Sequence, residues 1–314
     1  MHEHSELPLL GRTALVTGVS RRRGIAYAVA RKLASLGANV FIQHHRPHDL
    51  DQPWGGDDLD AVRAGIRDAL APGARFGDLG IDLGATARES EASERSEPAE
   101  RLIEAAAALT GHLDLLLCIH ARSGDSGGIL DLTGALLDAH WDVNTRSTLL
   151  LTAAFARRIA GVPTPSVDAA PRRPGERGEH GASAATSTDR PFAAPTGHVV
   201  WMTSGQIHGP MRGEVPYATS KAALAGVTST VAAELLEIGI RLNTVNPGPV
   251  NTGYLDPETT DRPLDAATEW IATTPFGRWG RPEDTAELIA WLCTDAGSWV
   301  VGQVLTSDGG IGIS

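Results

Sequence analysis

Short apolar runs that can form buried strands alternate with amphipathic helical patterns along almost the whole chain of 314 residues. The runs expected as strands lie near 12–17, 38–43, 74–81, 113–118, 198–203, 240–245 and 303–306. The helical patterns lie near 24–36, 58–71, 97–110, 136–160, 216–237 and 282–293. Such alternation is typical of βαβ units. The sequence therefore predicts one α/β domain over 1–314, with a doubly wound sheet of about seven parallel strands and helices on both faces.

Residues 161–197 interrupt this alternation. They contain six prolines and few bulky apolar residues, a composition that cannot bury enough surface to offset the entropy of ordering. We therefore expect a disordered insertion between the helix near 136–160 and the strand near 198–203. A linker between two domains is the alternative. A shorter exposed loop is expected at 88–98, which is rich in Ser and Glu.

Charge and cysteine content exclude several classes of function. The formal net charge is −11 at pH 7, which argues against nucleic acid or an anionic membrane as the main partner. Two cysteines, Cys118 and Cys293, are too few for a disulfide framework or a cysteine-based zinc site, and we expect buried thiols. No apolar run reaches the roughly 18 residues of a membrane span, and the N-terminus lacks a signal-peptide core. A cytoplasmic protein is expected.

Tyr217 and Lys221 stand four residues apart, just after Pro216, a residue suited to the first turn of a helix. On a helix the two side chains share one face. A nearby ammonium favours the phenolate and lowers the tyrosine pKa from its ordinary value near ~10. Such a phenol can exchange a proton with a carbonyl or alcohol oxygen at neutral pH. By itself, a pair at this spacing is in most cases part of an ordinary amphipathic surface.

Three further segments accompany the pair in a fixed order. Residues 12–18 form an apolar run that enters a Gly- and Arg-bearing turn, 141–144 open a helical stretch, and 197–205 contain an apolar run that ends at Ser204. Ser204 lies thirteen residues before Tyr217. With the Tyr–Lys pair, these segments resemble the short-chain dehydrogenase/reductase family over nearly the whole chain. The overall likeness is greatest to members grouped with 3-oxoacyl-acyl-carrier-protein reductases.

The resemblance implies a Rossmann-type domain with a catalytic tetrad of Asn144, Ser204, Tyr217 and Lys221. Tyr217 would donate a proton to the substrate oxygen, and Ser204 would hydrogen-bond that oxygen. Lys221 would favour the phenolate and hold the nicotinamide ribose, while Asn144 would position a water that links Lys221 to solvent. Because Asn144 precedes 161–197 and the other three follow it, one shared site argues against the two-domain alternative.

Residues 17–26 follow the first predicted strand and open the first predicted helix. Backbone amides and a helix N-terminus at such a turn can receive a pyrophosphate. The family spacing is Thr-Gly, three residues, Gly, any residue, Gly. Here five residues separate Gly18 from Gly24, and Ala26 replaces the last glycine.

A longer loop of this kind also resembles the enoyl-acyl-carrier-protein reductases. Those proteins separate their tyrosine and lysine by six residues. Position 224 here is Leu, so the spacing of Tyr217 and Lys221 favours carbonyl reduction.

The choice of cofactor depends on charge. A carboxylate closing the second strand would take the ribose hydroxyls of NAD, but the chain has Gln43, His44, His45 and Arg46 there. Arginines at 21, 22, 23 and 46 offer guanidinium forks to a 2′-phosphate. NADP(H) is therefore expected, with NAD(H) possible, and a solvated basic turn is the alternative.

The resemblance places Asp82 at the adenine and the loop 246–252 beside the nicotinamide. Together with the turn after the first strand, this gives the expected cofactor-binding residues: Gly18, Ser20, Arg21, Arg22, Gly24, Ile25, Arg46, Asp82, Asn144, Tyr217, Lys221, Pro247, Gly248, Val250 and Thr252.

Histidines at two places in the sequence raise the question of cofactor or metal binding. His120 stands in the segment 118–121, where the family has Asn-Asn-Ala-Gly, and is expected to be structural rather than a cofactor contact. His44, His45 and His48 lack a carboxylate framework, so no metal site is expected.

The substrate depends on residues after Thr252, about 253–274, which carry no readable code. A ketone such as a 3-oxoacyl thioester is the first hypothesis, and oxidation of a secondary alcohol or a sugar is the enzymatic alternative. A catalytically silent NADP(H) sensor is the alternative of another class. The family commonly pairs its two long central helices, here 136–160 and 216–237, so a homodimer or homotetramer is expected.

Overall fold

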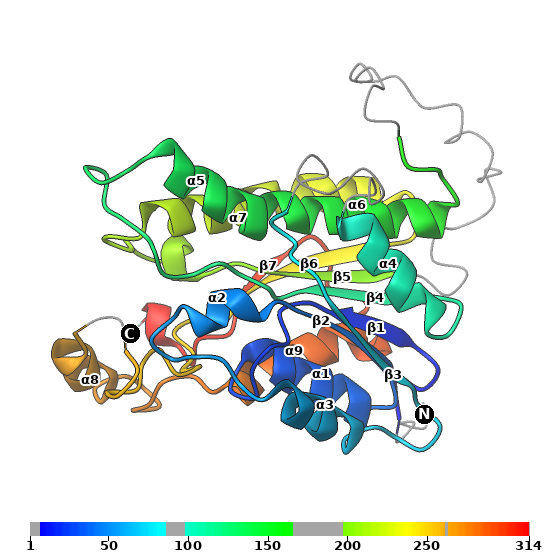
Figure 1. Ribbon diagram of the computed structural model, residues 1–314, viewed down its shortest axis with the longest axis horizontal. Coiled ribbons are helices and arrows are strands. Elements are labelled where there is room, and N and C mark those ends of the chain that lie inside the picture. Colours follow the sequence, from blue (N-terminus) through cyan, green and yellow to red (C-terminus); the bar gives the residue numbers. More distant parts are fainter. Residues whose placement is uncertain (1–6, 86–97, 166–196, 261–262, 314) are drawn as a thin grey trace.

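The computed structural model describes residues 7–85, 98–165, 197–260 and 263–313. Its centre is a seven-stranded sheet in the order β3-β2-β1-β4-β5-β6-β7, in which every neighbouring pair is parallel (Figure 1). The strands are β1 (Thr13–Val16), β2 (Asn39–His44), β3 (Phe76–Gly80), β4 (Leu115–Cys118), β5 (His198–Met202), β6 (Arg241–Asn246) and β7 (Val304–Thr306). The predicted α/β sheet of about seven parallel strands is confirmed.

Helices cover both faces of the sheet. In Figure 1, α1, α3 and α9 lie on one side and α4, α5, α6 and α7 on the other. The helices are α1 (Ile25–Ser35), α2 (Arg46–Leu50), α3 (Leu59–Arg67), α4 (Pro98–Ala108), α5 (Gly134–Trp141), α6 (Ser147–Ala160), α7 (Val215–Leu236), α8 (Asp265–Ile271) and α9 (Pro282–Cys293). Within the described ranges, no helix is both long and apolar enough to cross a membrane.

Successive residues of a central strand contribute their side chains to two separate apolar cores, one on each face of the sheet. Val16 and Leu117 belong to the apolar cluster that includes α1 and α9, whereas Leu15 and Leu116 belong to the cluster that includes α4 and α6. Successive side chains of a strand point to opposite faces. Because helices cover both faces, the central strands β1 and β4 are nearly continuous apolar runs rather than alternating patterns.

The predicted helix over 136–160 is divided into α5, a π-helical turn and α6. The π turn spans Asp142–Arg146. Just after it, the hydroxyls of Ser147 and Thr148 donate to the carbonyls of Val143 and Asn144, four residues back. Such back-bonding bends helices, and π turns often occur at functional sites.

The strands on either side of residues 161–197 pair directly, with Leu115 opposite His198. Both therefore belong to one sheet. The expected insertion falls mainly on residues 166–196, which lie outside the described residues, as does most of the expected loop at 88–98. Two short helices, α2 and α8, were not predicted.

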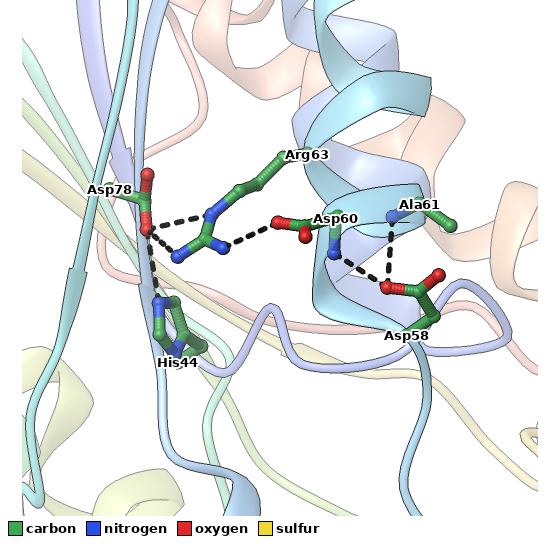
Figure 2. Close-up of polar contacts among 6 residues, drawn as sticks. All are labelled: His44, Asp58, Asp60, Ala61, Arg63 and Asp78. Carbon is green, nitrogen blue, oxygen red and sulfur yellow. Dashed lines mark hydrogen bonds and ion pairs between the residues drawn. The ribbon is translucent and has the colours of Figure 1, made fainter.

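A polar cluster joins β2, β3 and α3 near the start of α3 (Figure 2). Asp78 Oδ2 on β3 accepts hydrogen bonds from Arg63 Nη2 at 2.6 Å and from the ring of His44 at 3.1 Å. Burial tends to raise the pKa of Asp78, but the hydrogen bonds from Arg63 and His44 outweigh it and hold this pKa below its ordinary value. Burial lowers the pKa of His44 despite its contact with Asp78, so we treat its ring as neutral at pH 7.

We expect Asp78→Asn to lower the free energy of unfolding at pH 7 by about 1–2 kcal/mol, because a charge-assisted pair with Arg63 is lost. Since the folded pKa of Asp78 is depressed, its contribution is present above its unfolded pKa near ~4 and disappears at lower pH. Denaturant titrations at pH 7 and below pH 4 measure this difference. Asp60→Asn is the control, because Asp60 contacts the same arginine but is 88% exposed. Equal effects of both variants at pH 7 would contradict the assignment.

Candidate active site

A cavity of about 500 Å³ lies at the carboxyl ends of the central strands. The loops after β1, β2, β4, β5 and β6 and the first turns of α7 all contribute to its lining. The strand order reverses between β1 and β4, and doubly wound sheets bind ligands at this switch point.

Gly18 ends β1 in a conformation that few other residues could adopt. Its φ is +79°, and a Cβ there would lie 2.7 Å from the Cα of His120, which follows β4. Its amide donates to Gln43 Oε1 at 2.8 Å, and Gln43 Nε2 donates to the carbonyl of Ile81 at 2.7 Å. The turn after β1 is therefore fixed to the ends of three neighbouring strands.

The start of α1 suits a phosphate group. Ser20, Gly24 and Ile25 line the cavity beside Gly18. Gly24 is the N-cap of α1, makes no side-chain cap, and the first turn of α1 has no acidic residue. The first N–H groups of the helix thus remain available to an anion. This donor set fits the pyrophosphate of a dinucleotide.

Arg21 also lines the cavity, and it connects three loops. Its Nε lies 3.2 Å from Asp49 Oδ1, its Nη1 donates to the carbonyl of Thr252 at 2.9 Å, and its guanidinium lies 5.8 Å from the ring centroid of Trp54. The side chain is 14% exposed. Arg21 therefore contributes a cation to the cavity and connects the loop after β1 to Asp49 and Thr252, which follow β2 and β6.

Arg22 and Arg46 are absent from the described residues that line the cavity. Arg22 forms an exposed pair with Asp57 at 2.7 Å. Hydrogen bonds from Arg22 lower the pKa of Asp57 to about 2. Arg46 is exposed at the start of α2. The structure brings only Arg21, of the arginines expected at the cofactor, to the cavity.

The other expected cofactor residues come together around the same cavity. Pro247, Gly248, Val250 and Thr252 line it after β6. Gly248 has φ +65°, and a Cβ there would lie 2.4 Å from that of Asp308.

Asp82 lines the cavity beyond β3. Its Oδ1 accepts from the amide of Gly84 at 2.8 Å, and its Oδ2 lies 3.9 Å from His45 Nε2. One oxygen thus holds the local turn, and the carboxylate also faces a histidine of the loop after β2.

Ser204, Tyr217 and Lys221 line this cavity as well. Lys221 is almost fully buried, and its Nζ donates to the carbonyl of Met202 at 3.1 Å and lies 6.0 Å from the ring centroid of Tyr217. Burial lowers the pKa of Lys221 to about 8. A cation in this low-dielectric position interacts with its neighbours more strongly than one in water.

Asn144 is fully buried in the π turn and is absent from the described lining of the cavity. Its Nδ2 donates to the carbonyl of Arg122 and to Ser220 Oγ, while its Oδ1 accepts from the amide of Arg122 at 2.7 Å. The side chain thus fastens the loop after β4 to α7. Its geometry is that of a supporting residue.

His120 stands at the alanine of the family's Asn-Asn-Ala-Gly pattern, and it is buried. Its Nδ1 lies 2.6 Å from Thr17 Oγ1, and its Nε2 lies 2.7 Å from Ser147 Oγ. Burial lowers the pKa of His120 to about 3, so the ring is neutral. With Nε2 as the donor, His120 bridges the end of β1 to the first residue of α6.

The histidines at the end of β2 and just after it, His44, His45 and His48, contact separate partners. His44 contacts Asp78, His45 faces Asp82, and the amide of Ser123 lies 3.4 Å from His48 Nε2. In the described part of the chain, no three potential metal ligands come together.

Sequence reasoning missed the residues between β2 and α3 that reach the cavity. His48, Asp49 and Trp54 line it, and Trp54 packs against Tyr254 with ring centroids 6.4 Å apart. The one sequence feature that could have indicated this contact was Trp54 itself, a tryptophan in a Pro- and Gly-bearing stretch. Its partner lies two hundred residues later in the chain, so periodicity could not reveal the contact.

Several known proteins are similar to this chain. A family model described as Enoyl-(Acyl carrier protein) reductase matches residues 180–312. Uncharacterized oxidoreductase YjdA of Bacillus subtilis is 30% identical over 298 residues, covering 95% of each chain. L-rhamnose 1-dehydrogenase (NAD(P)(+)) of Azotobacter vinelandii is 30% identical and covers 96% of this chain and 97% of its own. The structure of a short-chain dehydrogenase/reductase from Serratia marcescens matches with a TM-score of 0.69 at 25% identity, over 97% of this chain and 99% of that one.

The parallel sheet, the cavity at its switch point and these matches define an oxidoreductase that acts on alcohol or carbonyl groups. The chain belongs to the short-chain dehydrogenase/reductase family, whose members generally bind NAD(P)(H).

We expect Gly18→Ala to destabilise the protein more than Gly11→Ala does. Gly11 has φ +80°, but a Cβ there would meet nothing within 4 Å. Its substitution should cost about 1–2 kcal/mol of backbone strain. At Gly18 the contact with the His120 backbone should add about 1–3 kcal/mol and weaken dinucleotide binding. Denaturant unfolding and cofactor titration of the two variants check this, and equal losses of stability would contradict the close approach.

Proposed function

We propose that the protein is an NADP(H)-dependent oxidoreductase that interconverts a carbonyl group and a secondary alcohol, with Tyr217 as the general acid or base. One observation carries the proposal. Ser204, Tyr217 and Lys221 line the same cavity as the turn after β1 and the uncapped start of α1. A proton donor and a dinucleotide cradle thus share one enclosed space.

The cofactor residues of this proposal are those of the cavity. Gly18, Ser20, Gly24 and Ile25 would hold the pyrophosphate, and the loop from Pro247 to Thr252 would face the nicotinamide. When bound, the dinucleotide supplies or accepts the hydride. The protein supplies position and electrostatic field.

In the reductive direction, Tyr217 donates its phenolic proton to the substrate oxygen as negative charge develops there. Ser204 donates a hydrogen bond to the same oxygen and stabilises that charge. Lys221 is held by the carbonyl of Met202 and stays largely protonated at pH 7, because its pKa is about 8. Its charge favours the phenolate that remains after proton transfer.

Asn144 does not line the cavity but supports Ser204, Tyr217 and Lys221 through hydrogen bonds to the neighbouring segments. Its side-chain hydrogen bonds to Arg122 and Ser220 join the loop after β4 to α7, one residue before Lys221. Both N–H groups of the Asn144 amide already donate, so in the water relay suggested by the family resemblance this side chain would offer only the second lone pair of Oδ1.

We propose a ketone, such as a 3-oxoacyl thioester or a related carbonyl compound, as the substrate in the reductive direction. Oxidation of a sugar or secondary alcohol is the second candidate, and it gains support from the relative named L-rhamnose 1-dehydrogenase. Assays with ketones, 3-oxoacyl thioesters, secondary alcohols and sugars distinguish these two. A silent NADP(H) sensor is disfavoured because both Tyr217 and Lys221 line the cavity.

The oligomeric state and the cellular location of the protein are also proposed rather than shown. Pairing of α5–α6 and α7 with a second copy would give a homodimer or homotetramer. Light scattering at micromolar concentration tests this. A cytoplasmic location stays a prediction.

We expect Tyr217→Phe to lower turnover by at least about 10²-fold, the lower end of what general acid–base catalysis contributes. The substitution removes only the hydroxyl, so the fold and the dinucleotide affinity should survive. Steady-state rates on the best substrate of the panel, with cofactor binding followed by fluorescence, measure both. Near-normal turnover in this variant would rule out Tyr217 as the general acid or base.

We expect NADPH to bind more tightly than NADH, because Arg21 lines the cavity, where it pairs with Asp49 of α2, and its guanidinium can donate to a 2′-phosphate. Arg21→Ala should reduce the ratio of the two dissociation constants. Arg22→Ala and Arg46→Ala are matched controls that should leave it nearly unchanged, because neither side chain lines the cavity. Equal affinity of the unmodified protein for both cofactors would refute the assignment.

A further inference from the structure

Residues 46–57, the β2–α3 segment, reach the cavity although neither the sequence pattern nor the family resemblance gave most of them a role. The segment begins with α2 and ends at the residue before the N-cap of α3. His48, Asp49 and Trp54 of this segment line the cavity. Figure 1 shows α2 at the same end of the sheet as α8, between the helix layers of the two faces.

Two ion pairs hold the segment to the turn after β1. Asp49 Oδ1 lies 3.2 Å from Arg21 Nε. Asp57 Oδ1 lies 2.7 Å from Arg22 Nη2, and its Oδ2 accepts from the amide of Arg22 at 2.8 Å. Each of these carboxylates is paired with an arginine, so neither brings an uncompensated negative charge to a pyrophosphate at this turn.

The segment also contacts the loop after β4. His48 Nε2 accepts a hydrogen bond from the amide of Ser123 at 3.4 Å, and both residues line the cavity. Gln52 is buried, and a Cβ at Gly124 would overlap its Oε1. In the sheet β1 lies between β2 and β4. The segment therefore crosses the carboxyl end of β1, where the turn suited to a pyrophosphate stands.

Trp54 carries the segment on to the loop after β6. Its ring packs edge-on against Tyr254, with centroids 6.4 Å apart and planes at 70°, and both side chains line the cavity. A Cβ at Gly253 would lie 3.3 Å from the Cβ of Trp54. β6 stands four positions from β2 in the sheet, about 19 Å at the ordinary strand spacing. The segment thus spans the cavity from one wall to the other.

A dinucleotide in this cavity would lie between two parts of the chain. Gly18 and the start of α1 line the cavity on one side, and His48 and Trp54 line it from the β2–α3 segment. The segment has its own contacts to the loops after β4 and β6, so it stays in place across the cavity by itself. Exchange of the dinucleotide requires these contacts to open.

We propose that the β2–α3 segment covers the bound dinucleotide, and that Trp54 is a positioning residue that holds the segment closed against the loop after β6. The inference rests on the proposed dinucleotide site. Opening must separate the ring of Trp54 from that of Tyr254, so this contact slows dissociation of the cofactor. Arg21 remains held by Asp49 and Thr252 when Trp54 is removed, so the contact acts on NADPH and NADH alike.

Hydrogen exchange of the unmodified protein tests the cover without any substitution. Saturating NADPH should slow amide exchange in residues 46–57 as well as in 17–26, because a bound dinucleotide opposes local opening of the segment. Mass spectrometry of peptic peptides follows both regions in one experiment. Protection of 17–26 without protection of 46–57 would overturn the proposal.

The dissociation rate tests the part played by Trp54. Protein loaded with NADPH or NADH is mixed with an excess of the oxidised dinucleotide, and the loss of reduced-nicotinamide fluorescence is followed by stopped flow. Trp54→Ala should raise both dissociation rate constants by roughly ten-fold, the scale expected for loss of an aromatic pair and its buried area. Unchanged rates would overturn the proposal. A rise confined to NADPH would also overturn it, because Trp54 would then act only through Arg21.

Two further variants complete the test. Trp54→Phe keeps a ring against Tyr254, so its dissociation rates should stay within about three-fold of those of the unmodified protein. Trp279→Ala is the matched control, because Trp279 is likewise half-buried and packs against Trp270 with centroids 6.4 Å apart, but is absent from the described lining of the cavity. It should leave both rates unchanged, and a rise equal to that of Trp54→Ala would overturn the proposal.

Failure of this inference can be distinguished from failure of the proposed function. If the unmodified protein binds neither NADPH nor NADH, the proposed function fails. If it binds them and residues 46–57 gain no protection, the inference alone fails.

Discussion

The close approach of two parallel strands, β1 and β4, at their carboxyl ends is the constraint on which the site depends. Gly18 follows β1 so close to the His120 backbone that a Cβ there would lie 2.7 Å from the Cα of His120. Thr17 hydrogen-bonds the His120 ring. The same ring contacts Ser147, at the start of α6. One neutral, buried histidine thus links the turn after β1 to the first residue after the π turn. The family's Asn-Asn-Ala-Gly pattern has an alanine at this position, and an alanine could make neither contact.

Around Tyr217 the dielectric constant is low, so a few buried charges dominate the electrostatic field there. Lys221 is buried and hydrogen-bonded to Met202, and burial lowers its pKa to about 8. The surface arginines act differently. Arg22 has an exposed carboxylate partner in Asp57, and such exposed pairs contribute little to stability. The residues that can influence a reacting oxygen are therefore the buried ones, although the exposed ones are more conspicuous in the sequence.

Much of the fold and part of the site could be predicted from the sequence. The seven strands follow from apolar runs, because strands covered by helices on both faces must be apolar throughout. Gly18, Ser20, Arg21, Gly24, Ser204, Tyr217 and Lys221 line one cavity, as the family resemblance implied. The π turn was missed because a helical sequence pattern does not distinguish it from a continuous α-helix. The hydroxyls of Ser147 and Thr148 donate to carbonyls of this turn. Arg22 and Arg46 were expected at the cavity because composition does not reveal where a long side chain points.

The sequence alone determined the order of strands and helices and the residue types available for proton transfer, because period and spacing are local properties. Tertiary structure alone decided which of these residues share an environment. Arg21 reaches Asp49, Trp54 and Thr252 only because loops after β2 and β6 converge at one sheet edge. His140 meets both Gly124 and Tyr217 only because α5 packs against α7 beside the loop after β4. Desolvation and hydrogen-bond partners are set by such non-local packing, and they fix which groups carry charge.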